Sequence, residues 1–230
     1  MPAKVDYQAL SDFNVVGGDL SKAISADAYS WIVKLLITKR LGYGANRILD
    51  VGCGRGRQVA HLDNVVGLDA DLPSLRFAKR LSDNDFVFAY ANWLPFRESS
   101  FDFVIMSEVI EHLPDQRGAV KEVTRVLLPN GRFLIQTPNR RLTLGIFVHR
   151  RYGHVREFTL KELRAFLSDL GFEVMLRTAS TIPYIPSGSR LYKLNFNRAF
   201  FSIWKSLDKI IRLKWDIIVL ARKRASEMFA

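Results

Sequence analysis

The chain has 230 residues, of which 48% are hydrophobic, and a formal net charge of +11, so it can bury one sizeable core and is predicted to form a single domain. Cys53 is its only cysteine, which excludes an internal disulfide and a metal site built from several cysteines. No apolar run is long enough to cross a bilayer and no basic-then-apolar leader opens the sequence, so we expect a cytoplasmic protein.

Hydrophobic periodicity predicts helices that alternate with strands along most of the chain. The expected helices cover residues 21–41, 72–81, 117–128, 160–170 and 200–211, and the expected strands cover residues 47–51, 64–69, 85–90, 101–107, 131–137, 172–178 and 215–223. The turn at residues 129–131 is expected to end the helix before it. Strands that alternate with helices predict a mostly parallel sheet with helices on both faces.

The helix over residues 160–170 has the clearest boundary signals. Thr159 and Glu162 have the spacing of a capping box, and Phe158 and Leu163 can form a hydrophobic staple. Gly171 supplies the stop. We therefore expect this helix to begin and end where these residues place it.

The second half of the chain carries the positive charge. Lysines and arginines balance aspartates and glutamates over residues 1–137, so the whole excess lies in residues 138–230. This predicts that the C-terminal half meets a polyanion, a membrane surface or an acidic substrate, although ordinary solvated surface charge would give the same pattern. Two connections there, residues 138–158 and 181–199, are long enough to be substrate-covering segments.

The stretch "ILDVGCGRGR" at residues 48–57 places Gly52, Gly54 and Gly56 directly behind an acid-ended strand. Such glycines indicate unusual backbone dihedrals or a ligand that approaches bare backbone. The spacing differs from the G-x-G-x-x-G of dinucleotide sites. Asp50 would repel a pyrophosphate but attract a ligand that carries an amino group and a sulfonium.

Asp69 ends the next predicted strand, where an acid can accept hydrogen bonds from ribose hydroxyls. Taken alone, either acid is more often a turn residue or a helix-capping residue than a ligand contact. Together with Asp50, in a strand-helix-strand frame, Asp69 favours a nucleoside that carries a cation.

Several segments resemble the successive motifs of class I S-adenosylmethionine-dependent methyltransferases. They are "ILDVGCGRGR", "VVGLDAD", "LPFRESSFDFVIMSEVIEHLPD", "EVTRVLLPNGRFLIQTPN" and "HVREFTLKELRAFLSDLGFEV". They are most similar to the type 11 methyltransferase domain group, which includes quinone-biosynthesis and other small-molecule methyltransferases. The resemblance covers about residues 45–180 and the last strand.

This resemblance implies an α/β, Rossmann-like, seven-stranded sheet in the order 3-2-1-4-5-7-6, with strand 7 antiparallel and helices on both faces. S-adenosylmethionine, and its product S-adenosylhomocysteine, would lie across the carboxyl ends of strands 1 to 4. Within residues 1–230, we expect a helical cap at 1–44, a cofactor-binding half at 45–137 and a substrate-side half with basic insertions at 138–230.

By position, the resemblance assigns cofactor contacts to eleven residues. The glycine loop would contact the methionine part of the cofactor, and Asp69 and its neighbour would contact the ribose. The residues before "LPF" would contact the adenine. The residues at the end of strand 4 would contact the sulfonium end. The eleven residues are Asp50, Gly52, Cys53, Gly54, Gly56, Asp69, Ala70, Ala91, Asn92, Ser107 and Glu108. Tyr90 stands where relatives commonly carry an acid that meets adenine, and Trp93 is expected either to stack on the base or to be an ordinary packing residue.

Methyl transfer needs a general base only when the acceptor must lose a proton. His112 and His154 are the candidate catalytic bases, with a structural role as the alternative for each. Glu108, Glu111 and His112 also resemble a divalent metal cluster of quinone O-methyltransferases. Because the same letters occur in relatives without a metal, we expect none here.

Three functions stay open at this point. The first is methylation of a small or lipid-like acceptor, anionic or amphiphilic, that is held by residues 1–30, 138–158 and 181–211. If the acceptor is a lipid, we expect a location peripheral to the membrane. The second is methylation of RNA or protein through the basic half. The third is a non-catalytic domain that keeps the fold and the cofactor.

Overall fold

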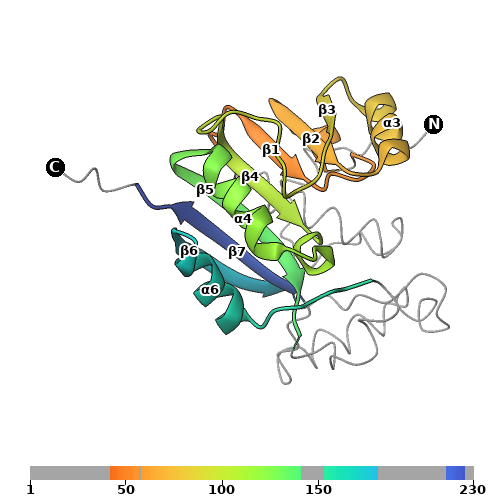
Figure 1. Ribbon diagram of the computed structural model, residues 1–230. Coiled ribbons are helices and arrows are strands. Elements are labelled where there is room, and N and C mark those ends of the chain that lie inside the picture. The colour runs from red at the N-terminus through yellow and green to blue at the C-terminus, as the bar shows by residue number, and fades with distance from the viewer. Residues whose placement is uncertain (1–41, 57, 141–152, 181–215, 226–230) are drawn as a thin grey trace, which may run out of the picture. The chain divides into compact units, whose positions relative to one another are not determined.

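The structure is a computed structural model that describes residues 42–56, 58–140, 153–180 and 216–225. Its seven strands form one sheet in the order β3-β2-β1-β4-β5-β7-β6 (Figure 1). The strands are β1 Ile48–Val51, β2 Val65–Asp69, β3 Asp85–Phe88, β4 Phe101–Ser107, β5 Leu127–Pro138, β6 Phe172–Ser180 and β7 Asp216–Lys223. Both antiparallel pairings in the sheet involve β7, and the other pairings are parallel, which confirms the predicted order and the antiparallel strand.

Burial along the strands explains why the sheet forms in this order. All four residues of β1 are buried, as are five of the seven residues of β4, whereas β3 at the edge has no buried residue. Near-continuous apolar runs suit central parallel strands that are covered on both faces. The sheet centre is therefore β1 and β4, and their carboxyl ends lie side by side.

Three α-helices lie within the described residues: α3 Leu72–Leu81, α4 Gln116–Val126 and α6 Leu160–Asp169. Asp71 and Asp115 cap α3 and α4, and the predicted capping box of Thr159 and Glu162 begins α6. Short 3-10 turns follow β1 and β4, η2 Val59–His61 and η3 Ile110–His112.

The helices are expected on both faces because the chain moves outward in two directions from β1 and β4. Right-handed crossovers then place α3, between β2 and β3, opposite α4, between β4 and β5. Helices α4 and α6 lie side by side on one face, joined by an ion pair of 2.7 Å between Arg117 and Asp169 (Figure 1).

The boundary between α4 and β5 was predicted wrongly. The helix ends at Val126 rather than at residue 128, and β5 already begins at Leu127. Leu127 is fully buried and pairs with Phe101 at the start of β4, and a register shift between Phe101 and Phe103 accommodates the residues that follow. Pairing and burial outweigh the helical pattern, and the predicted turn lies inside the strand, with Asn130 at φ 61°.

Several predictions concern residues outside the described ranges. They are the helices over 21–41 and 200–211, the cap over 1–44 for the most part, the connection 181–199 and most of the connection 138–158. None of the helices that the structure describes combines the length and apolar character needed to cross a membrane.

Candidate cofactor and acceptor site

The glycine loop after β1 has a left-handed backbone at alternate positions. Gly52, Gly54 and Gly56 have φ values of 77°, 53° and 70°. The N–H groups of Gly52 and Cys53 both donate to the carbonyl of Leu68, at 2.7 and 3.0 Å. These bonds tie the loop to the end of β2, so the loop curls across the carboxyl end of the sheet.

The three glycines serve two different purposes. A Cβ atom on Gly52 would lie 2.3 Å from Cγ2 of Val109, and one on Gly56 would lie 2.6 Å from Cβ of Ala78 in α3. These two glycines allow close packing. A Cβ atom on Gly54 would meet no described atom within 4 Å, so its backbone faces open space where a ligand can approach.

Asp69 links the glycine loop to the start of α3. One carboxylate oxygen accepts the N–H of Gly54 at 2.7 Å, and the other accepts the N–H of Asp71 at 2.8 Å. Each oxygen has a second lone pair, so ribose hydroxyls can still bind there. Ala70, the other predicted ribose neighbour, is exposed at this edge.

Asp50 is a buried acid at the centre of the sheet, where it pairs with Gly67 of β2 and Ile105 of β4. It is 2% exposed. Burial, and secondly the negative charge of Asp69, raise its pKa from 3.8 to about 8. A cationic ligand would reverse this effect by favouring the carboxylate, as the sequence predicts.

Cys53 is a packing residue of the loop rather than a reactive thiol. Its Sγ lies where a Cβ atom on Gly67 would come within 2.9 Å. Burial, and then the acids Asp50 and Asp69, raise the pKa of the thiol above its ordinary value of 9.0. The thiol is therefore protonated. Cys53 contributes to the site through its backbone N–H and by helping to set the shape of the loop.

The predicted adenine side follows β3. Ala91 is buried, and the amide nitrogen of Asn92 donates to the carbonyl of Asp115 at 2.7 Å. Asn92 thus joins this loop to the start of α4. Tyr90 is 61% exposed and Trp93 is 80% exposed, so the expectation that Trp93 is an ordinary packing residue is wrong.

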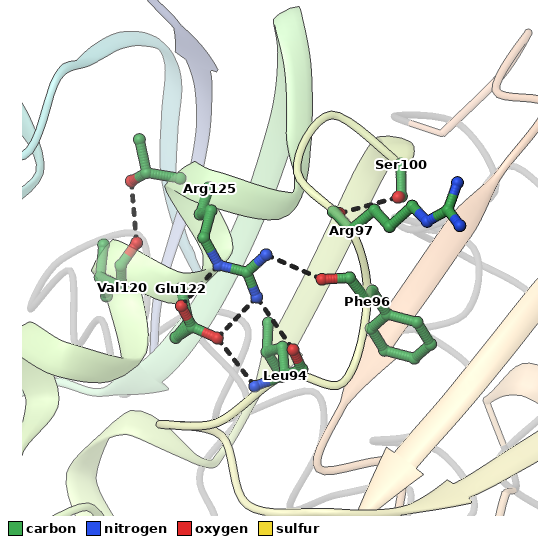
Figure 2. Close-up of polar contacts among 8 residues, drawn as sticks. Leu94, Phe96, Arg97, Ser100, Val120, Glu122 and Arg125 are labelled. Carbon is green, nitrogen blue, oxygen red and sulfur yellow. Dashed lines mark hydrogen bonds and ion pairs between the residues drawn. The ribbon is translucent and has the colours of Figure 1, made fainter.

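An Arg125–Glu122 ion pair on α4 holds the next part of this loop, as Figure 2 shows. The guanidinium of Arg125 donates to the carbonyls of Phe96 and Leu94, at 2.7 and 2.9 Å, and the carboxylate of Glu122 accepts the N–H of Leu94 at 2.9 Å. Ser100 closes the turn through the carbonyl of Arg97 (Figure 2). The network fixes the path of residues 94–100 against α4.

The predicted acceptor side lies at the carboxyl ends of β4 and β5. Ser107 Oγ donates to Gln136 Oε1 at 3.4 Å, and the N–H of Glu108 donates to the Gln136 carbonyl at 2.9 Å. Glu108 has a φ of 57°, a left-handed conformation that is strained for a residue with a side chain. This turn places Val109 over Gly52 and so joins the acceptor side to the glycine loop.

Glu111 and His112 lie in η3, directly after this turn. Glu111 is fully buried and accepts the hydroxyl of Thr137 at 3.0 Å. The side chain of His112 is 41% exposed, with Nε2 4.0 Å from Glu111 Oε1 and Nδ1 3.4 Å from the carbonyl of Gly153. Burial, and secondly the nearby His154, lower the pKa of His112.

His154 comes from a distant part of the sequence and packs against His112. The two ring centroids are 4.7 Å apart in an edge-to-face arrangement. His154 Nδ1 lies 2.7 Å from Glu157 Oε1, and the Glu157 side chain is fully buried. Sequence reasoning missed Glu157, because an acid three residues after a histidine gives no signal of burial.

One group of potential metal-ligand atoms occurs among the described residues, in Glu111, His112 and His154, within 4.8 Å of one another. This group contains His154, whereas the metal cluster implied by the resemblance contained Glu108 instead. Each of these side chains already has a protein partner: Thr137, Gly153 and Glu157, respectively. The cluster is therefore consistent with a hydrogen-bonded network, and the expectation of no metal stays a prediction.

Comparisons with known proteins find that this chain is similar to methyltransferases. Residues 49–135 match the family described as a methyltransferase domain. An uncharacterized protein of Methanocaldococcus jannaschii is 30% identical over 72% of this chain and 76% of its own. A probable S-adenosylmethionine-dependent methyltransferase of Mycolicibacterium smegmatis is 36% identical, but the match covers 55% of this chain and only 52% of that protein.

A solved structure shows the same fold at low identity. The cyclase SpnF superposes with a TM-score of 0.65 and 21% identity, over 89% of this chain and 85% of its own. At this identity the match concerns the fold alone, and the neighbour's name shows that one fold can host different chemistry.

Proposed function

Because this chain belongs to the class I S-adenosylmethionine-dependent methyltransferases, we propose that it transfers a methyl group to a small-molecule or lipid-like acceptor. The observation that carries the proposal is the pairing of the open backbone at Gly54 with the buried acid Asp50. The open backbone at Gly54 leaves room for a bulky ligand, and the buried carboxyl group of Asp50 favours a cationic one. The residues present therefore fit this cofactor.

The chain's own residues would bind and orient the cofactor and the acceptor; they would not need to activate the methyl group. A methyl group on a sulfonium is already activated, so the protein has to hold the acceptor in line and exclude water. The Gly54 backbone and Asp50 would hold the methionine end, and Asp69 the ribose. Ser107 and Glu108, at the strained turn after β4, would border the methyl group and the acceptor.

Two relatives support an apolar acceptor through what their names say of them. A demethylmenaquinone methyltransferase of Thermotoga maritima is 32% identical over 44% of this chain and 48% of its own. A phthiotriol/phenolphthiotriol dimycocerosates methyltransferase of Mycobacterium tuberculosis is 35% identical over 39% of this chain and 37% of its own. Because both matches are partial, the acceptor class is our proposal for this chain.

Label partition tests the proposed acceptor class. The protein is incubated with tritiated-methyl S-adenosylmethionine and a cell extract, which is then separated into organic-soluble, nucleic-acid and protein fractions. We expect label in the organic-soluble fraction, and none with Gly54→Val. The exposed Glu173→Gln change, far from the site, serves as the active control.

The positive charge of residues 138–230 favours a second candidate, an RNA acceptor. It predicts label in nucleic acid, and RNA binding that weakens steeply as salt rises. Binding to anionic vesicles without RNA binding would support the lipid-like acceptor and a location at the membrane surface. Label in the nucleic-acid or protein fraction would overturn our preference.

A further inference from the structure

The amide side chain of Asn92 joins the adenine-side loop, residues 89–96, to the first turn of α4. Its Nδ2 donates to the carbonyl of Asp115, the residue that caps this helix, at 2.7 Å. A carbonyl oxygen only accepts hydrogen bonds, so the amide nitrogen must face Asp115. The resemblance placed Asn92 among the cofactor contacts, whereas in the structure this part of its side chain binds the protein.

A glycine in the first turn of α4 makes this approach possible. Glycine is unfavourable inside a helix, so Gly118 needs a packing reason. A Cβ atom there would lie 2.9 Å from Asn92 Nδ2 and closer still to Asp115 Oδ2. Gly118 therefore leaves the space that the helix cap and the Asn92 amide occupy.

The loop begins directly beside the predicted ribose acid. The N–H of Ala89 donates to the carbonyl of Asp69 at 3.2 Å, and the Asp69 carboxylate accepts the N–H of Gly54 at 2.7 Å. These two bonds connect the loop to the open backbone where the cofactor is proposed to bind. Residues 89–96 therefore lie at the carboxyl edge of the sheet, next to the proposed position of the nucleoside.

Helix α4 also holds the end of the loop. The N–H of Leu94 donates to Glu122, and its carbonyl accepts from Arg125, both at 2.9 Å (Figure 2). Ala91 is buried just before Asn92, and its N–H makes no hydrogen bond to any residue that the structure describes. This N–H is the group that the loop can offer to a ligand, and the Asn92 bond is the attachment beside it.

We propose that Asn92 is a positioning residue for the cofactor and does not contact it: its bond to Asp115 fixes the turn that presents the N–H of Ala91 to the adenine ring. This inference rests on the proposed function and deepens it by naming what determines recognition of the base. An N–H donor suits adenine, whose N1 accepts a hydrogen bond, and opposes hypoxanthine, whose N1 carries a proton. The protein should therefore prefer an adenosine ligand to an inosine ligand, and Asn92 should control that preference.

Asn92→Asp tests the role, because a positioning role and a direct contact predict opposite results. Aspartate has nearly the same shape, but its carboxylate cannot donate to the Asp115 carbonyl. In calorimetric titrations we expect roughly tenfold weaker binding of S-adenosylhomocysteine and no loss for its inosine analogue, S-inosylhomocysteine. If Asn92 contacted the adenine amino group through its carbonyl oxygen, the aspartate would bind S-adenosylhomocysteine as tightly as the wild-type protein or more tightly.

Asn84 provides a matched control. Its amide also donates to backbone carbonyls, those of Val59 and Leu62 at 2.7 and 3.2 Å, but it lies before β3, at the amino end of the strand. Asn84→Asp should lower the melting temperature and leave the preference for the adenosine ligand unchanged. Gly118→Ala, which alters only α4, should reproduce the loss of preference expected for Asn92→Asp.

Unchanged or tighter binding of S-adenosylhomocysteine by Asn92→Asp would overturn the proposal. An equal loss for both ligands, or the same loss of preference in Asn84→Asp, would also overturn it, because Asn92 would then be a general stabiliser of the fold. A wild-type protein that binds both ligands equally well would overturn this inference alone. Failure of the proposed function would appear differently, as a wild-type protein that binds neither ligand.

Discussion

Raising the pH from about 6 to about 7.5 is expected to strengthen cofactor binding, because Asp50 must lose a proton to pair with a cationic ligand. Asp50 is 2% exposed, and its pKa of about 8 results from burial and then from the charge of Asp69. The free protein therefore holds mostly neutral Asp50 over this range. A bound ammonium favours the carboxylate, so binding releases a proton.

The size of the effect follows from that single proton. While Asp50 is protonated in the free protein and ionised in the complex, affinity rises about tenfold per pH unit, or about thirtyfold over the range. The ligand's own amino group adds little, because an ordinary α-amino pKa of about 7.7–8.0 keeps it largely charged. Asp50→Asn cannot titrate, so its binding should be weaker and independent of pH.

Isothermal calorimetry with S-adenosylhomocysteine measures both quantities. Titrations in two buffers of different ionisation enthalpy give the number of protons released on binding. We expect close to one for the wild-type protein near neutral pH and none for Asp50→Asn. Wild-type affinity that is flat across the range, with no proton released, would refute the assignment of Asp50 to the ligand cation.

Four further outcomes follow from the same geometry. The unliganded protein should lose about 1.4 kcal/mol of stability per pH unit between about pH 4 and 8, because the unfolded chain ionises Asp50 while the fold keeps it protonated, and denaturant melts of Asp50→Asn should lack this slope. Gly54→Val should abolish S-adenosylhomocysteine binding and also lower the melting temperature, because valine is strained at the left-handed φ of Gly54, whereas Gly56→Val, which is strained in the same way and also meets Ala78, should lower the melting temperature further. Asp69→Ala should weaken binding at least tenfold, since it removes the ribose acceptor and the bond to the Gly54 N–H, and unchanged affinity would contradict its role. Methyl transfer should survive EDTA, and loss of activity that magnesium or zinc restores would make the Glu111 cluster a metal site.

The individual helices and strands were predicted well because their sequence signals are local, whereas the order of the strands came from the family resemblance. Strand β4 and helix α3 lie where periodicity placed them, and the Thr159–Glu162 capping box is present at the start of α6. The exception is β5, whose first residues follow pairing with Phe101, a contact between residues far apart in the sequence. Helical periodicity in residues 127 and 128 could not reveal that competition.

The site was predictable only where the backbone defines it. Glycine spacing located the loop, but only the structure separates Gly54, which faces open space, from its two packing neighbours. Several side-chain contacts were not visible in the sequence, because they bring distant segments together. Examples are Asn92 with the start of α4, and the His154–Glu157 pair brought against His112.

Binding of S-adenosylmethionine tests the central claim most directly. In calorimetric titrations of the wild-type chain, we predict saturable binding with micromolar affinity for S-adenosylmethionine and no detectable heat with NAD, because the loop lacks the G-x-G-x-x-G spacing of dinucleotide sites. No binding of S-adenosylmethionine, or saturable binding of NAD at the same loop, would contradict the account.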